Sequence, residues 1–158
     1  MVNMNNTEII QKKYAEAIKG INEEWFTTVD SKWYSYIINL PFHLRSTYLI
    51  VVFHNQIYNG GFHQFFVNGY GQFAKETINV LIKIGALNKA ELLKKALHIV
   101  NSDNKSDEVF RKELLNKDIK SLFVEDFLFE SLDKLDTQYY ALEKEDLEKL
   151  LCNYLQCL

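Results

Sequence analysis

The stretch from Pro41 to Tyr58, "PFHLRSTYLIVVFHNQIY", is apolar on nearly every side. Its run "YLIVVF" would suit a buried strand, but Leu44, Tyr48 and Val51 recur at helical intervals. Pro41 suits the first position of a helix, and the rest of the chain offers no convincing strand to pair with this run. A helix that is apolar all round has to be covered on every side. The stretch therefore predicts a central buried helix.

Apolar stripes at helical spacing on both sides of this stretch predict further helices. Thr7 is the expected N-cap of a helix over residues 7–21, which would be an N-terminal extension. Asn88 and Glu91 have the spacing of a capping box. One apolar side of a later helix is predicted from Phe123, Phe127, Leu128, Leu132 and Leu135. We expect an all-α fold, a single compact domain over residues 1–158 with about seven to nine helices around the central one.

Four of the six glycines fall in "NGGFHQFFVNGYG", residues 59–71. A helix that ends there leaves carbonyl groups unpaired, and Gly60 or Gly61 can adopt the left-handed conformation that lets later amides pair with them. The sequence Asn68-Gly69 predicts a second sharp turn. This stretch therefore predicts a double corner in the chain.

Between the two corners, Phe62, Phe65 and Phe66 are spaced to share one face of a short helix, which we expect to enter the core. The polar residues of the same stretch are expected to hydrogen-bond the backbones of the turns, as buried polar groups usually do. These residues are Asn59, Gln64 and Asn68.

An alternative interpretation makes the same region an enzyme active site or a small-ligand site. Histidine is the commonest general base, and side-chain amides can hold an oxyanion or a ligand carbonyl. The candidate residues are His54, Asn59, His63, Gln64 and Asn68. No serine, cysteine or carboxylate lies within residues 59–71 to act as nucleophile or to orient a histidine. The structural interpretation is favoured, and the functional one stays open.

Two long runs resemble a bacterial domain family of unknown function whose best-known relative is a DNA mimic protein. They are "VFHNQIYNGGFHQFFVNGYGQFAKETINVLIKIGA" and "LDKLDTQYYALEKEDLEKLLCNYLQ". The resemblance covers roughly residues 25–156 and rests on Asn59-Gly60-Gly61-Phe62, Gln64-Phe65-Phe66 and Asn68 taken together. In this family a glutamate often precedes the motif, where this chain has Gln56.

The resemblance implies an all-helical fold and no established catalytic activity. One member of the family is an acidic dimer that occupies a transcription factor in place of its DNA operator. By that resemblance this chain is expected to be a non-enzymatic protein-interaction module, with transcription regulation as one role. The partner would be a basic DNA-binding regulator or, alternatively, a toxin or nuclease, and a homodimer is the expected assembly.

The charge distribution is uneven. The formal net charge is −3, yet residues 121–148 hold nine acidic residues against Lys134 and Lys144. A protein that binds nucleic acid directly should show the opposite, a basic stripe. The acidic residues are Glu125, Asp126, Glu130, Asp133, Asp136, Glu143, Glu145, Asp146 and Glu148.

These acids have two interpretations. Carboxylates on an amphipathic helix are usually its solvated face. Alternatively, Asp126, Glu130 and Asp133 lie at i, i+4 and i+7, so that one helix ridge would present carboxylates at phosphate-like intervals of about 5–6 Å. The second interpretation predicts an acidic surface that binds a basic protein, with Glu125, Asp136 and the acids of residues 143–148 extending it.

No metal or cofactor site is expected. No two of the four histidines have the spacing of metal ligands on a helix, and Cys152 and Cys157 form no Cys-x-x-Cys motif. The sequence contains no apolar run of transmembrane length and no recognisable signal peptide, so we expect a cytoplasmic protein with no membrane contact.

Overall fold

The computed structural model describes residues 3–156, and within them the regular elements are all helices. The predicted all-α fold is confirmed. The helices, in chain order, are α1 (Asn6–Ile18), η1 (Glu23–Thr27), α2 (Lys32–Ile38), α3 (Phe42–Val67), η2 (Tyr70–Phe73), α4 (Ala74–Ile84), α5 (Leu87–Val100), α6 (Asp107–Leu115), α7 (Lys120–Phe123), α8 (Phe129–Tyr140) and α9 (Leu147–Gln156). Here η1 and η2 are 3-10 helices.

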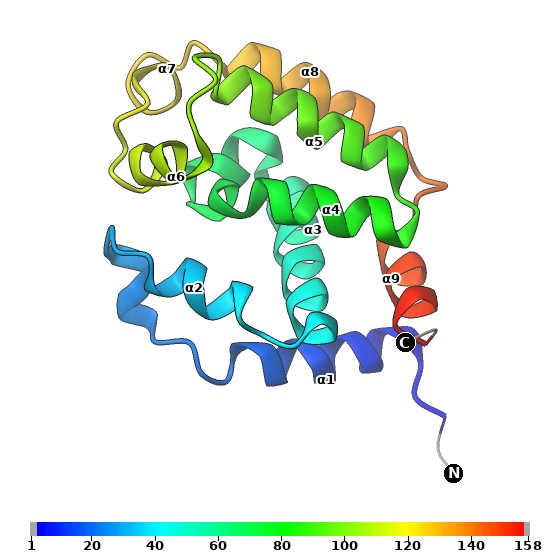
Figure 1. Ribbon diagram of the computed structural model, residues 1–158. Helices are drawn as coiled ribbons and strands as arrows, with labels where there is room; N and C mark the ends of the chain where they lie inside the picture. The colour runs from blue at the N-terminus through cyan, green and yellow to red at the C-terminus, as the bar shows by residue number, and fades with distance from the viewer. Residues whose placement is uncertain (1–2, 157–158) are drawn as a thin grey trace.

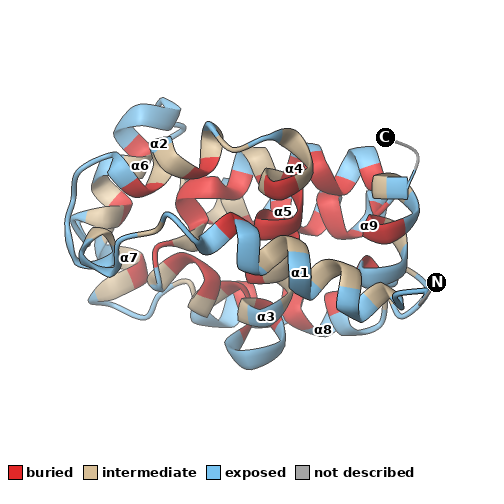
Figure 2. Ribbon diagram, turned by 90° about the horizontal axis from the view of Figure 1, so that it is seen from below, coloured by how far each residue is buried: buried red, intermediate tan, exposed pale blue. Residues whose placement is uncertain are grey.

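The predicted central helix is α3, which runs through the middle of the molecule in Figure 1. It packs against α1, α4, α8 and α9, so helices from both ends of the chain cover it. Burial follows the same arrangement, since the buried residues in Figure 2 lie inside the bundle and the outer faces are exposed. The prediction of a central buried helix from the apolar pattern is confirmed, but Pro41 is the N-cap residue and Phe42 the first residue of α3.

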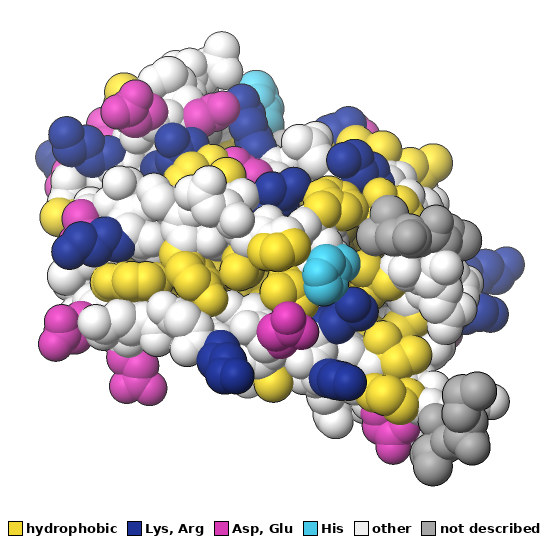
Figure 3. Space-filling model, turned by 60° about the horizontal axis from the view of Figure 1, so that its bottom comes forward, with side chains coloured by type: hydrophobic (Ala, Val, Ile, Leu, Met, Phe, Trp, Pro, Cys, Tyr) yellow, Lys and Arg dark blue, Asp and Glu magenta, His cyan; other side chains and the backbone are white. Residues whose placement is uncertain are grey.

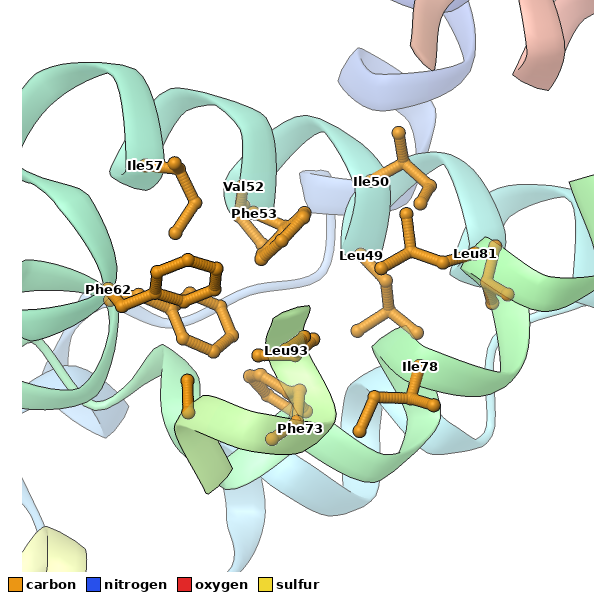
Figure 4. Packing of buried hydrophobic residues seen from close by; sticks show 14 of the residues in the cluster. Leu49, Ile50, Val52, Phe53, Ile57, Phe62, Phe73, Ile78, Leu81 and Leu93 are labelled. Atoms are coloured by element: carbon orange, nitrogen blue, oxygen red, sulfur yellow. The ribbon is translucent and has the colours of Figure 1, made fainter. Parts of the chain in front are cut away.

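The core is one large cluster of buried hydrophobic residues centred on α3. Phe62, Phe65 and Phe66 are all fully buried, which confirms that this part of the glycine-rich stretch enters the core. Figure 4 shows Phe62 pointing toward Phe53 of the earlier part of the same helix. Their ring centroids are 6.3 Å apart. The two parts of α3 thus pack against each other through aromatic rings.

Two predicted helix starts were wrong. The N-cap of α1 is Asn5, not Thr7, because Asn5 forms the capping box with Glu8. The helix α5 begins at Leu87, so Asn88 is its second residue and not its cap. Its first amides are satisfied from a distant loop by Glu145, as described below. Local spacing cannot reveal a cap that comes from another part of the chain.

The apolar side predicted from Phe123 to Leu135 is also partly wrong. The helix α8 begins only at Phe129, and Phe127 lies in the preceding turn with 76% of its surface exposed. Leu132 and Leu135 are buried as predicted. Among residues 3–156, no helix is both long enough and apolar enough to span a membrane.

Candidate partner-binding surface and the α3–α8 junction

The helix α3 is bent at Gly61, whose φ of 76° and ψ of −169° are outside the helical region. Only glycine adopts this conformation readily. A Cβ atom at this position would also overlap the carboxylate of Asp136 on α8. The glycine pair was predicted to end a helix, and the structure shows instead a bend between two helical segments. The second predicted corner is confirmed, since Gly69 is left-handed with φ 87°.

Asp136 caps the second segment of α3. Its Oδ1 accepts a hydrogen bond from the backbone N–H of Phe62 at 2.8 Å, directly after the bend. The first amides of a helical segment lack partners within it, and a carboxylate is a favourable partner there. A side chain at position 61 would occupy the space of the Asp136 carboxylate, so this hydrogen bond requires a glycine there.

Asp136 was predicted to lie on the partner-binding surface, and it does not. It is only 9% exposed, because its carboxylate points at α3 and not into solvent. Burial raises the pKa of Asp136 above its ordinary value, while the hydrogen bond from Phe62 opposes that rise. The residue belongs to the internal structure of the α3–α8 junction.

The polar side chains of the glycine-rich stretch were expected to hydrogen-bond the turn backbones. In the structure they hydrogen-bond one another instead. The side-chain oxygen of Gln56 accepts hydrogen bonds from the amides of Gln64 and Asn68, at 3.0 and 2.9 Å. Asn59 donates to the side-chain oxygen of Gln64 at 3.0 Å. This amide cluster joins the two segments of α3 across the bend. Gln56 serves in it as an acceptor of two hydrogen bonds, a role that a glutamate oxygen could also fill.

The two histidines of the alternative site contact different parts of the structure. The ring centroid of His54 lies 4.5 Å from that of Tyr58. The pKa of His54 is lowered, mainly by burial and to a smaller extent by the positive charge of Lys89. The ring of His63 lies 5.5 Å from that of Phe129 at the start of α8. Neither His54 Nδ1 nor His63 Nε2, both buried, has a hydrogen-bond partner among the described residues.

The best-formed surface hollows of residues 3–156 are not lined by the residues of the alternative site. Five of them are lined by other segments, chiefly α2, α4, α5 and α6. The largest, of about 440 Å³, lies between Val29–Ser35 and α6. The residues in question are His54, Gln56, Asn59, Gly60, Gly61, Phe62, His63, Gln64 and Asn68. Their arrangement is that of a packed structural joint.

The same joint fixes the position of α8. At one end of α8, Phe129 packs on His63. At the other end, the hydroxyl of Tyr140 donates to the carbonyl of Ile57 at 2.7 Å. Between them Tyr139 is fully buried and packs edge-on against Phe62, 5.9 Å away. The glycine-rich stretch therefore holds the helix that carries several of the predicted acidic residues.

Three predicted acids of the 143–148 segment have structural partners. Glu145 accepts hydrogen bonds from the backbone amides of Asn88 and Lys89, at 3.0 and 2.8 Å, and so caps α5. Asp146 accepts from the amide in the first turn of α9 at 3.1 Å. Glu148 accepts from the hydroxyl of Thr7 on α1 at 2.7 Å. Glu143 is exposed.

Seven of the nine predicted acids are exposed, and four of them lie close together along the chain: Glu125, Asp126, Glu130 and Asp133. They do not form the single ridge that was predicted, because α8 begins after Asp126, which lies in a turn with φ 48°. Glu130 and Asp133 share one side of α8, where Lys134 lies 3.6 Å from Glu130. We refer to these four residues as the α7–α8 acidic surface.

The sequence analysis missed three exposed hydrophobic residues in this region: Val124, Phe127 and Phe129. Their spacing next to Leu128 and Leu132 is compatible with the inner side of one continuous helix, which is why Phe127 was placed there. The turn at Asp126 breaks that continuity. No local signal predicts it, since a non-glycine residue with positive φ is uncommon.

The described residues include no group of three or more His, Cys, Asp or Glu side chains that could hold a metal ion. On the opposite side of the molecule, Figure 3 views the face that includes α1 and shows Lys and Arg interspersed with Asp and Glu around a band of hydrophobic side chains. Positive and negative side chains are mixed on that face, so it does not favour a partner of either charge.

Comparison with known families decides the classification. The model of the family described as DMP19-like protein matches residues 38–157, most of the chain. This chain belongs to the DMP19-like family. The family is named after a DNA mimic protein, in agreement with the resemblance. No curated protein and no solved structure matches the chain.

The DMP19-like match covers both segments that carry the resemblance, including α3, α8 and α9. It begins at residue 38, whereas the resemblance was expected to begin near residue 25. It does not test the motif of Asn59–Asn68 by itself, so the role of that motif as a family signature stays a prediction.

Proposed function

We propose that this chain is a DNA mimic that binds a basic protein partner through the α7–α8 acidic surface, and that the partner is a DNA-binding regulator. Membership of the DMP19-like family supports a mimic. The observation that carries the choice of surface is the exposure of Glu125, Asp126, Glu130 and Asp133. Two of these acids lie on α8, which the α3–α8 junction holds, and two lie in the turn before it. A toxin or nuclease with a basic surface is the alternative partner.

The physical reasoning concerns charge and rigidity. Glu130 and Asp133 share one side of α8, and carboxylates at this helical spacing of about 5–6 Å resemble successive backbone phosphates in both sign and separation. Complementary charge mainly accelerates association and selects the partner, and it weakens as salt screens it. Because the junction holds α8 at both ends, Glu130 and Asp133 are presented without an ordering cost on binding.

The test compares two variants of equal charge. One replaces the surface acids by Glu125→Gln, Asp126→Asn, Glu130→Gln and Asp133→Asn. The control carries Glu16→Gln, Glu23→Gln, Glu24→Gln and Glu91→Gln, which are exposed acids on other elements. Proteins captured from native cytosol at low and moderate salt are identified, and the affinity of any DNA-binding protein is then measured with purified components.

We expect the first variant to weaken binding of that protein by about tenfold or more, and the control to bind like the natural chain. Equal binding by the two variants, or affinity that does not change with salt, would contradict the proposal. A captured nuclease or toxin in place of a regulator would favour the alternative partner.

The proposal includes a homodimer as its assembled form. Two copies related by a two-fold axis would present two α7–α8 acidic surfaces, as symmetric association usually does. Sedimentation velocity at micromolar concentration tests this part separately. A monomer that still binds the partner would remove the dimer and leave the acidic surface in place.

A further inference from the structure

The two most exposed large hydrophobic side chains among residues 3–156 lie within the α7–α8 acidic surface. Val124 is 74% exposed and Phe127 is 76% exposed, and Phe129 follows at 53%. Along the chain they alternate with acids, since Glu125 and Asp126 separate the first two. Other exposed hydrophobic residues are spread over the molecule, but the two most exposed ones lie in this short segment with carboxylates around them.

A defined turn holds these side chains outward. The carbonyl of Lys120 accepts hydrogen bonds from the amides of Val124 and Glu125, at 2.9 and 3.0 Å. The amide of Phe127 donates to the carbonyl of Ser121 at 3.1 Å. Asp126 completes the reversal with its positive φ. The backbone is thus hydrogen-bonded on both sides of Asp126, and the exposure of Phe127 is part of the folded structure.

Exposure of such residues has a cost that a partner can remove. Burying an exposed Val or Phe side chain is favourable, and grouped exposed apolar residues commonly mark interaction sites. The surrounding carboxylates restrict the choice of partner. They repel the phosphates of nucleic acid and of anionic lipid surfaces, and they attract Lys and Arg.

We infer that Val124 and Phe127 are hydrophobic anchors that enter an apolar pocket within the basic surface of a protein partner. This inference rests on the proposed function and assigns a separate role to each kind of residue. The four acids orient the basic surface of the partner and raise the association rate. The anchors, once buried, slow dissociation and discriminate between partners of similar charge. A smooth imitation of the DNA backbone would need no such anchors.

Two synthetic helical peptides of about 18 residues serve as probes, long enough to form helix. Both carry about six lysines, one has leucines along one face, and the other has glutamines there. Titration into the isotopically labelled full chain is followed by amide chemical shifts. We expect the leucine peptide to bind about tenfold more tightly, with the largest shifts in residues 121–133.

The variant Val124→Ser with Phe127→Ser should abolish this tenfold preference and leave the weaker, salt-sensitive binding of both peptides. Leu87→Ser is the matched control, because Leu87 is also exposed, at 58%, but lies at the start of α5. The control should retain the preference. Amide spectra of each variant confirm that the fold is kept.

Equal binding of the two peptides, or shifts of the leucine peptide outside residues 121–133, would overturn the inference. If binding is equal but still lost on neutralising the four acids, the proposed function stands and only the anchors fail. If neutralising the four acids leaves binding of both peptides unchanged, the proposed function fails together with the inference.

Discussion

Gly61 combines an unusual backbone conformation with the close approach of Asp136. Replacing it, Gly61→Ala, should lower the free energy of unfolding by about 2–5 kcal/mol, because strain and overlap add. Gly85→Ala is the matched control. Gly85 also has a positive φ, 92°, but no atom within 4 Å of an added Cβ. Its replacement should cost only about 1–2 kcal/mol. Urea denaturation of both variants measures the difference.

A double variant separates the two causes at Gly61. If the overlap is with the Asp136 carboxylate, Gly61→Ala should cost less in a chain that already carries Asp136→Ala than in the natural chain. Costs that simply add would contradict the contact and leave only backbone strain.

Asp136 should make stability depend on pH. Its raised pKa means that the folded chain binds this proton more tightly than the unfolded chain does. The resulting stabilisation is complete below the ordinary value of 3.8 and is lost as pH rises through the raised pKa of Asp136. The free energy of unfolding of the natural chain should therefore fall, relative to that of Asp136→Asn, as pH increases through this window. Urea denaturation across the acidic range gives both curves.

Two further variants control this experiment. Glu130→Gln, on the exposed side of α8, should leave the pH-dependent difference in place, because Glu130 does not shift the pKa of Asp136. Asp136→Ala should lower stability at every pH by about 1–3 kcal/mol, because the amide of Phe62 loses its partner. A natural chain whose stability runs parallel to that of Asp136→Asn would show that the buried carboxylate does not titrate as described.

The different fates of Asp133 and Asp136 show a limit of sequence reasoning. Both are acids on one helix, and charge counting treats them alike. Asp136 is buried because its partner is the amide of Phe62, 74 residues earlier. Spacing within a helix cannot identify such a partner. By contrast, the burial of Phe62 could be predicted, because its apolar neighbours recur at helical intervals nearby.

At the scale of single elements, α5 depends on Glu145 for the capping of its first turn. Glu145→Ala should lower the free energy of unfolding by about 0.5–2 kcal/mol, as the loss of an N-cap does. Glu143→Ala, two residues away and exposed, should change it by less than about 0.5 kcal/mol. Thermal denaturation distinguishes them. Equal effects would mean that the cap contributes nothing.

The elements also differ in how well the sequence predicts them. The helix at the centre of α3 can be predicted, because its apolar residues recur at helical intervals. The start of α8 cannot, because the turn at Asp126 depends on hydrogen bonds to the carbonyls of Lys120 and Ser121. The sequence therefore places the exposed acids of the candidate surface in this segment, whereas it does not reveal the exposed hydrophobic residues beside them.

At the scale of the whole molecule, the helix α1 lies before the family match yet is part of the core. Ala17 is fully buried, and the ring of Tyr14 stacks on Tyr48 at 6.0 Å. A chain that lacks residues 1–20 should melt about 10 °C or more below the full chain. A chain that lacks only residues 1–3 keeps the Asn5 cap and should melt like the full chain. Equal melting of all three would make α1 dispensable.

The bond between Phe62 and Asp136 also sets an order of events during synthesis. The ribosome produces the whole of α3 before the residue that caps its second segment has been translated. Until Asp136 emerges, the bend at Gly61 has no partner, and the three buried phenylalanines after it have no α8 to cover them. The nascent chain therefore presents an aromatic segment to chaperones, and the fold closes only when most of the polypeptide has left the ribosome.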